Sequence, residues 1–225
     1  MHVPDGFMDS PTCVVAGATA LLGVTHAVRA LRAERPDDDR VPMAALVATF
    51  VFAAQMINVQ VAGGTSGHLI GAAVAAVLVG PATAVICLTG VLAVQAVFFA
   101  DGGLGAIGVN VTLMALITTM VGWLVFRAVL AMLPKVRAAV PVAAAAGALI
   151  SVPASAVAFA AIYAIGGAAP VGVIDLLVSM AGWHTLIGVG EAVVTGVVVS
   201  VVIAVRPDLV FGVRRLRAVP ESADA

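Results

Sequence analysis

Residues 68–100 read HLIGAAVAAVLVGPATAVICLTGVLAVQAVFFA, and this long apolar stretch decides how many helical segments the chain contains. As one helix it would be about 50 Å long, at a rise of about 1.5 Å per residue, whereas a bilayer core is only about 30 Å thick. Pro81 follows Gly80 and breaks the helix, because proline lacks a backbone N–H and clashes with the preceding turn. We therefore expect two segments, 68–80 and 82–100. The first would be only about 20 Å long, so His68 should lie below the outer membrane surface.

The composition places the whole chain in a membrane. Of its 225 residues, 62% are hydrophobic and only 10% are charged, and the mean hydropathy is +1.17. A soluble domain is about half apolar and about a quarter charged. Further apolar runs fall at 10–31, 41–60, 107–133, 139–165 and 173–205. The expected fold is therefore an all-α integral membrane bundle of about seven transmembrane segments.

The basic residues predict the orientation of this bundle. The 11 Lys and Arg residues follow the first, fifth and seventh segments, and a seven-segment topology brings all of them to one face. Since positive charge favours the cytoplasm, we expect the N-terminus outside and the C-terminus inside, in the plasma membrane. Asp5, Asp9 and Asp101 would then lie on the outer face, and ERPDDDR (34–40) would form a polar cytoplasmic turn.

Several function classes find no support in the sequence. No P-loop motif is present, so ATP hydrolysis by that route would need a separate protein. No basic patch with interleaved aromatic residues indicates nucleic-acid binding. Cys13 and Cys87 form no CxxC motif and are expected to be small buried hydrophobic residues.

The first ten residues, MHVPDGFMDS, suggest a metal chelator. No basic side chain precedes the first apolar run, so we expect no cleaved signal peptide and a retained Met1 with a free amine. The amine, the His2 backbone nitrogen and the His2 ring nitrogen can then surround one ion. His68, expected at a helix start where a protonated imidazole is disfavoured, would supply a fourth nitrogen. A planar set of four nitrogens suits Ni(II) or Cu(II). The alternatives are an incidental His2 and a His68 that only bonds to its loop.

Other polar residues in apolar surroundings are candidates for the neighbourhood of an ion or for its pathway. The candidates for these roles are Asp5, Asn58, Ser66, His184 and Glu191. Gln55, Gln60, Gln95 and Asn110 are further polar residues within the apolar runs. His184 and Glu191 are seven residues apart and therefore share a helix face. For both residues the alternative is a purely structural role between helices, and for Asp5 it is the capping of a turn.

Four blocks of the sequence resemble one family. They are MHVPDGF (1–7), GGTSGHLIGAAVAAVLVGP (63–81), FADGGLGAIGVNV (99–111) and HTLIGVGEA (184–192). In order and spacing they are similar to the CbiM/NikM family, the substrate-binding membrane subunits of energy-coupling factor transporters for cobalt and nickel. The resemblance implies one transmembrane metal-binding domain over 1–205, with segment 1–9 inserted into the bundle, and a cytoplasmic tail over 206–225.

The resemblance also implies a ligand set and partners. Nitrogens of Met1, His2 and His68 would hold Co²⁺ or Ni²⁺ as the transported substrate, with no organic cofactor. A small membrane subunit, a coupling transmembrane subunit and cytoplasmic ATPase subunits would complete an importer that serves cobalamin synthesis or nickel enzymes in a prokaryote. The start MHVPDG resembles nickel-type members more than cobalt-type members. The alternative functions are a membrane scaffold or pore subunit and a membrane metalloenzyme.

Overall fold

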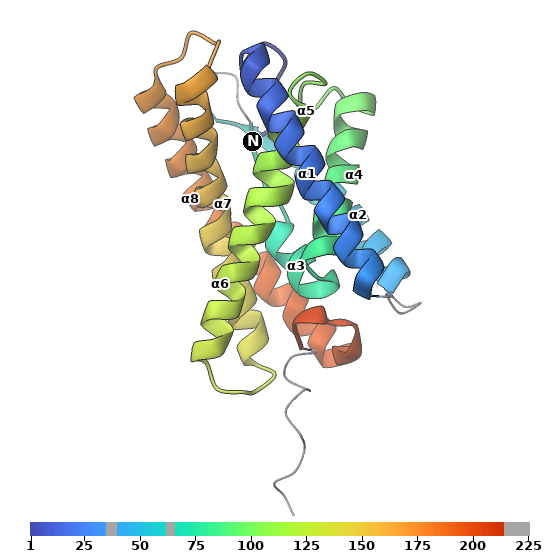
Figure 1. Cartoon of the computed structure of the whole chain (residues 1–225). Helices are drawn as coiled ribbons and strands as arrows, with labels where there is room; N and C mark the ends of the chain where they lie inside the picture. The colour runs from blue at the N-terminus through green and yellow to red at the C-terminus, as the bar shows by residue number, and fades with distance from the viewer. Residues whose placement is uncertain (35–39, 62–65, 214–225) are drawn as a thin grey trace, which may run out of the picture.

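The computed structural model describes residues 1–34, 40–61 and 66–213, and it shows helices packed side by side in one bundle (Figure 1). The elements in chain order are α1 (Ser10–Glu34), α2 (Arg40–Gln55), β1 (Asn58–Gln60), β2 (Ser66–His68), α3 (Ala72–Val79), α4 (Pro81–Phe98), α5 (Ile107–Asn110), η1 (Val111–Ile117), α6 (Thr118–Met132), α7 (Ala139–Gly166), α8 (Val173–Val205), η2 (Pro207–Leu209) and η3 (Phe211–Val213). The predicted helical class is confirmed.

Within the described residues, five helical stretches are long and apolar enough to cross a membrane: α1, α4, the continuous run Ile107–Met132, α7 and α8. The apolar part of α2, Val41–Gln55, is shorter. Helix α3 has only 8 residues, all of them buried. The predicted break is confirmed, because α3 ends at Val79, Gly80 has a φ of 89°, and α4 begins at Pro81.

Two sequence-based boundaries were wrong. The run 41–60 is not one helix, because α2 ends at Gln55 and Asn58–Gln60 forms an extended strand. His68 does not open a helix, because it lies in strand β2, opposite Asn58 in an antiparallel pair. Gly71 adopts a left-handed conformation with a φ of 77°, so the helix begins only at Ala72. Strands of three residues are too short to leave a periodic pattern.

Some expectations fall outside the described residues. These are most of the polar turn 34–40, the first part of the glycine-rich motif (62–65) and the end of the tail (214–225). The beginning of the tail is described and packs against the bundle, since the side chains of Val210 and Val213 are buried. Gly212 in η3 lies against the ring of Phe126 in α6.

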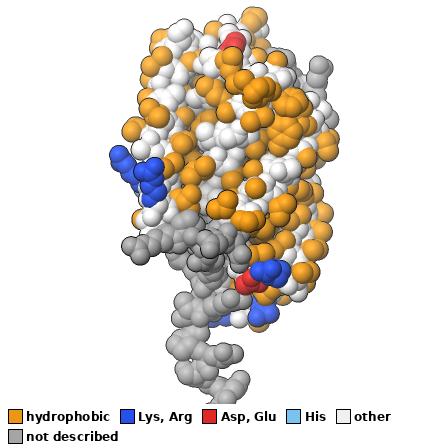
Figure 2. Space-filling view, turned by 90° about the vertical axis from the view of Figure 1, so that its right-hand side faces the viewer, with side chains coloured by type: hydrophobic (Ala, Val, Ile, Leu, Met, Phe, Trp, Pro, Cys, Tyr) orange, Lys and Arg blue, Asp and Glu red, His pale blue; other side chains and the backbone are white. Residues whose placement is uncertain are grey.

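The bundle exposes apolar side chains and buries polar ones. Leu22 in α1 is 72% exposed and Ile174 in α8 is 68% exposed, whereas Ser151 and Ser155 in α7 are fully buried. Figure 2 shows hydrophobic side chains spread over the face in view. This distribution is inverted relative to a soluble protein and fits a surface in contact with lipid.

The described Lys and Arg residues gather at one end of the bundle. The end of α1, the α6–α7 connection and the end of α8 lie toward the lower end in Figure 1, away from the N-terminus. Figure 2 shows one group of Lys and Arg side chains at the left edge near mid-height and another at the lower right. The stretches that carry the described basic residues therefore lie away from the N-terminus, whereas the number of seven segments and their orientation stay predictions.

Candidate metal centre

The first residues of the chain are buried inside the upper half of the bundle (Figure 1). Met1 is 1% exposed, His2 5% and Val3 0%. The backbone N–H of Val3 donates to Asn110 Oδ1 at 2.7 Å, and Asn110 Nδ2 donates to the Val3 carbonyl at 3.2 Å. The same carbonyl accepts a hydrogen bond of 2.9 Å from Gly103 N. The segment is thus fixed between α5 and the α4–α5 loop.

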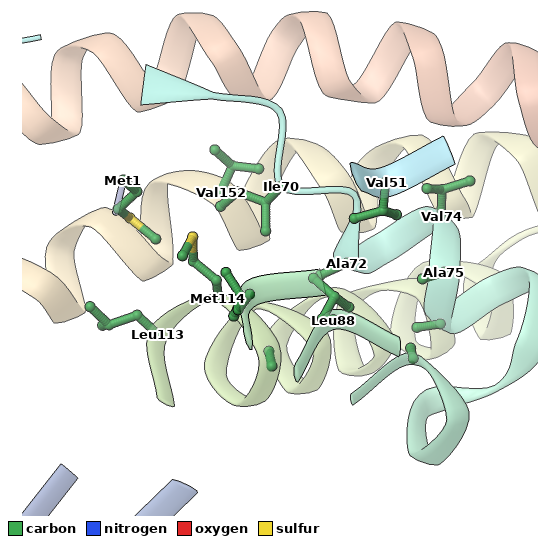
Figure 3. Packing of buried hydrophobic residues seen from close by; sticks show 14 of the residues in the cluster. Met1, Val51, Ile70, Ala72, Val74, Ala75, Leu88, Leu113, Met114 and Val152 are labelled. Carbon is green, nitrogen blue, oxygen red and sulfur yellow. The ribbon is translucent and has the colours of Figure 1, made fainter. Parts of the chain in front are cut away.

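The Met1 side chain anchors this segment in the apolar core. It lies beside Leu113, Met114 and Val152 in the hydrophobic cluster (Figure 3). Leu113 and Met114 belong to η1, a π-helical stretch that directly follows Asn110. Such stretches are common at functional sites. The Met1 amine points the other way, toward β2, and contacts Ser66 Oγ at 3.5 Å.

Two imidazoles meet next to the amine. The ring centroids of His2 and His68 are 4.6 Å apart, with an angle of 40° between the rings. His68 Nδ1 is 2.9 Å from the Leu69 carbonyl oxygen. Since a carbonyl only accepts, Nδ1 carries the hydrogen and Nε2 carries the free lone pair. Nε2 is buried and has no hydrogen-bond partner among the described residues. His68 is therefore in the form that binds a metal ion.

Burial keeps all three nitrogen groups uncharged. It lowers the pKa of the Met1 amine from 8.0 to about 4, although the charge of Asp101 opposes this shift. It lowers the pKa of His2 from 6.5 to about 3, with a further contribution from the nearby amine. The pKa of His68 is also well below 6.5, through burial and then through the amine and His2. At neutral pH these groups present lone pairs, not protons.

Asp101 stands behind His2, and the sequence did not single it out as a site residue. Its Oδ2 atom is 3.7 Å from His2 Nε2, and its carboxylate also accepts a hydrogen bond from Asn58. Burial raises the pKa of Asp101, against the opposing effects of the amine and Asn58. At 3.7 Å this approach is a contact and not a hydrogen bond, and neither atom has a hydrogen-bond partner among the described residues. A carboxylate that does bond to one ring nitrogen of a histidine orients the ring and leaves the other nitrogen for a metal. The signal was present, because Asp101 follows an apolar segment in the quoted block FADGGLGAIGVNV.

The remaining candidates lie around this cluster in different roles. Asp5 is exposed and accepts a hydrogen bond of 2.8 Å from Gly105 N, which ties the N-terminal segment to the α4–α5 loop. His184 in α8 is fully buried, and its Nδ1 atom bonds to the Met180 carbonyl at 2.8 Å. Its Nε2 atom has no hydrogen-bond partner among the described residues. Glu191 contacts the backbone that follows His68, and not the imidazoles themselves.

Side chains alone do not form a conventional metal site here. Among the described residues, no group of three or more His, Cys, Asp or Glu side chains is arranged to hold an ion. The cluster brings the His2 and His68 imidazoles together with the Met1 amine. The fold and this cluster define a multi-pass membrane protein with a nitrogen-rich candidate metal centre.

Comparison with known proteins gives the family. A family model described as the cobalt uptake substrate-specific transmembrane region, CbiM, matches residues 2–209. A protein of Haloquadratum walsbyi whose name proposes a role in metal transport is 34% identical, over 94% of each chain. The fused nickel transport protein NikMN of Rhodobacter capsulatus is 39% identical, over 56% of this chain and 36% of its own length. The crystal structure of a truncated transition metal transporter superposes with a TM-score of 0.84 at 32% identity, covering 91% of this chain and 99% of the other.

The chain belongs to the CbiM family. The predicted resemblance is thereby confirmed, and so is the expectation of a transporter subunit in place of an enzyme, because the family and its solved relatives are metal transporters.

Proposed function

We propose that this protein is the metal-capture subunit of an energy-coupling factor importer for cobalt or nickel ions. The observation that carries the proposal is the meeting of the Met1 amine, His2 and His68 in one buried cluster. A buried lone pair without a partner costs free energy. A bound ion would remove that cost.

The proposed ligands are four nitrogens. They are the Met1 amine, the His2 backbone nitrogen, a His2 ring nitrogen and His68 Nε2. The amine and both rings are already neutral, so the proton that must leave on binding is the one on the His2 backbone nitrogen. Neighbouring chelate rings along the first two residues favour a planar arrangement, which suits Ni(II) and tolerates Co(II).

The groups around the ligands would orient them. Asp101, itself bonded by Asn58, would hold the His2 ring, and Ser66 would hold the amine. His184 lies fully buried in α8. Its unpartnered Nε2 atom would accept a hydrogen bond from the metal-bound amine. Asp5 would keep the segment closed over the ion through Gly105.

The membrane topology in this proposal has seven segments, with the N-terminus outside and the C-terminus in the cytoplasm of a prokaryotic cell. The short helix α3 counts as a partial segment, and the gathering of basic residues at one end of the bundle supports the orientation. The domain over 1–205 would capture the ion. A small membrane subunit, a coupling subunit and ATPases would supply the energy, since the chain itself has no P-loop.

The test is metal loading of the purified protein, offered cobalt, nickel, copper and zinc together. We expect about one equivalent of cobalt or nickel on the wild type, and its loss in His2→Ala and His68→Ala. His26→Ala in α1 is the matched control, because it removes an imidazole far from the cluster in sequence and should keep the ion. Equal loading of His68→Ala and the wild type would overturn the proposal.

A further inference from the structure

Glu191 is a buried carboxylate that forms hydrogen bonds with the backbone just after His68. It lies in α8 and is 2% exposed. Its Oε2 atom accepts a hydrogen bond of 2.6 Å from Ile70 N, and its Oε1 atom accepts one of 3.0 Å from Gly71 N. Both oxygens are therefore used, and both on backbone groups of consecutive residues.

The local backbone explains why a carboxylate fits there. Gly71 is in the left-handed region, with a φ of 77°, so the N–H groups of residues 70 and 71 converge on one anion. Helix α3 begins at Ala72, and its N-terminal end also favours negative charge. A side chain on Gly71 would be strained at this φ, and its Cβ would come within 2.8 Å of Val51 Cγ2.

A second polar side chain, from α2, forms a hydrogen bond with the backbone of Ile70. Gln55, at the end of α2, donates from Nε2 to the Ile70 carbonyl at 2.8 Å. Both backbone polar groups of Ile70 are thus bonded to side chains of other helices. Its own side chain is fully buried in the hydrophobic cluster, near Val51 and Val152 (Figure 3). The position of Ile70 is consequently fixed by hydrogen bonds and by packing.

The fixed position of Ile70 determines where His68 Nε2 lies. Only Leu69 separates His68 from Ile70, and the Leu69 carbonyl itself holds the His68 ring through Nδ1. On the other side, His68 is paired with Asn58 in the β1–β2 ladder. A histidine held in this way can place Nε2 at one coordination position of a metal ion and cannot move it to another.

This inference rests on the proposed function. We propose that Glu191 is a positioning residue that holds His68 Nε2 at the fourth position of the planar set of nitrogens. The site thereby discriminates against Zn(II). Planar nitrogen sets suit Ni(II), whereas Zn(II) prefers a tetrahedral arrangement. Metal sites select among ions chiefly by geometry and not by raw affinity. A His68 that moves freely would let the ligands rearrange toward the tetrahedron and admit zinc.

Glu191→Gln is the sharpest variant. Glutamine has nearly the same size, but it offers one oxygen in place of two, and its NH2 group faces an N–H donor. One of the two backbone bonds is lost and the loop loosens. Gln55→Met is a second, milder variant that removes only the bond to the Ile70 carbonyl and leaves the carboxylate in place.

Thr195→Val is the matched control for both variants. Thr195 is fully buried, one turn beyond Glu191 in α8, and its hydroxyl has no hydrogen-bond partner in the described part of the chain. The substitution Thr195→Val removes a buried polar group from the same helix and leaves residues 68–71 and their hydrogen bonds unchanged.

The experiment offers equal nickel, cobalt and zinc to each purified protein and measures both the total metal bound and the ratio of ions. We expect Glu191→Gln to bind metal with its ratio of nickel plus cobalt to zinc lowered by about tenfold or more, in the range typical for residues that orient ligands. Gln55→Met should shift the ratio in the same direction by less, and Thr195→Val should keep the wild-type ratio.

The outcomes separate this inference from the proposed function. A wild-type ion ratio in both Glu191→Gln and Gln55→Met, with metal still lost in His68→Ala, would overturn the role of Glu191 and leave the capture site standing. A wild type that binds no metal would overturn both. If Glu191→Gln does not accumulate, the ratio in Gln55→Met decides.

Discussion

The side-chain amide of Asn110 forms two hydrogen bonds with the backbone of Val3. Its Oδ1 atom accepts from Val3 N at 2.7 Å, and its Nδ2 atom donates to the Val3 carbonyl at 3.2 Å. Asn110 is 1% exposed and ends α5, just before the π-helical stretch that packs under Met1. One side chain thus fixes the register of the N-terminal segment inside the bundle.

Asn110→Ala should release this segment. It removes two hydrogen bonds and leaves Val3 N–H buried without a partner, at a cost of about 2 kcal/mol. That free energy corresponds to roughly a 30-fold loss, and we expect metal affinity to fall by about this factor. Titration of the purified variant with nickel or cobalt measures it. Thr112→Val is the control, since Thr112 bonds to the Ala16 carbonyl in α1 and not to the segment. Equal affinities in the two variants would contradict the role of Asn110.

Asp101→Asn should weaken the site without abolishing it. The amide keeps the shape of the side chain but removes the charge that faces His2 Nε2. We expect the metal affinity to fall by about 10- to 100-fold, with about one ion still bound at saturation. Asp5→Asn is the comparison, because Asp5 is exposed and the amide oxygen of asparagine can still accept the hydrogen bond from Gly105 N. An affinity as high in Asp101→Asn as in Asp5→Asn would show that Asp101 does not orient His2.

Acid should undock the N-terminal segment. The pKa of the amine is 8.0 in solvent and about 4 when docked, so a proton binds preferentially to the undocked state. Docking is then strongest above pH 8 and weakens as the pH falls from 8 toward 4. The lowered pKa of His2 acts in the same direction. Hydrogen exchange of the Val3 amide, corrected for its intrinsic rate, should show less protection at pH 5.5 than at pH 8. The amide of Ala156 in the middle of α7 should not change. Constant protection of Val3 would contradict this account.

Two glycines should respond in opposite ways to alanine. A Cβ at Gly108 in α5 would run into the backbone of Gly17 in α1, whereas a Cβ at Gly182 in α8 would meet nothing within 4 Å. Gly108→Ala should lower the free energy of unfolding by about 1–3 kcal/mol through overpacking. Gly182→Ala should raise it by up to about 1 kcal/mol, because alanine favours the helix. Thermal unfolding in one detergent compares them, and a Gly108→Ala protein as stable as the wild type would refute the close contact.

The helices were predictable because their causes are local. Apolar runs mark α1, α4, α7 and α8 within a few residues, and Gly80 and Pro81 mark the break between α3 and α4. The strands β1 and β2 were not predictable, because three residues beside a glycine-rich loop carry no period. The helix start at His68 was wrong for a related reason, since the left-handed Gly71 separates it from α3.

The candidate site was predictable only in part. Met1, His2 and His68 stand out because of their chemistry and their motifs. Asp101 and Asn110 act through contacts that join distant parts of the chain, to His2 and Val3 respectively. Nothing near either residue in the sequence shows these partners. The contacts appear only in the folded protein, where Asp101 lies in the α4–α5 loop and Asn110 ends α5.

One residue added before Met1 shows whether the amino-terminal nitrogens hold the ion. The extension converts the free amine into an amide and needs space where Met1 is 1% exposed. A protein extended by one residue at the C-terminus is the control. We predict about one equivalent of cobalt or nickel on the native and C-terminally extended proteins, and none on the N-terminally extended one. Full metal binding by the N-terminally extended protein would contradict the account.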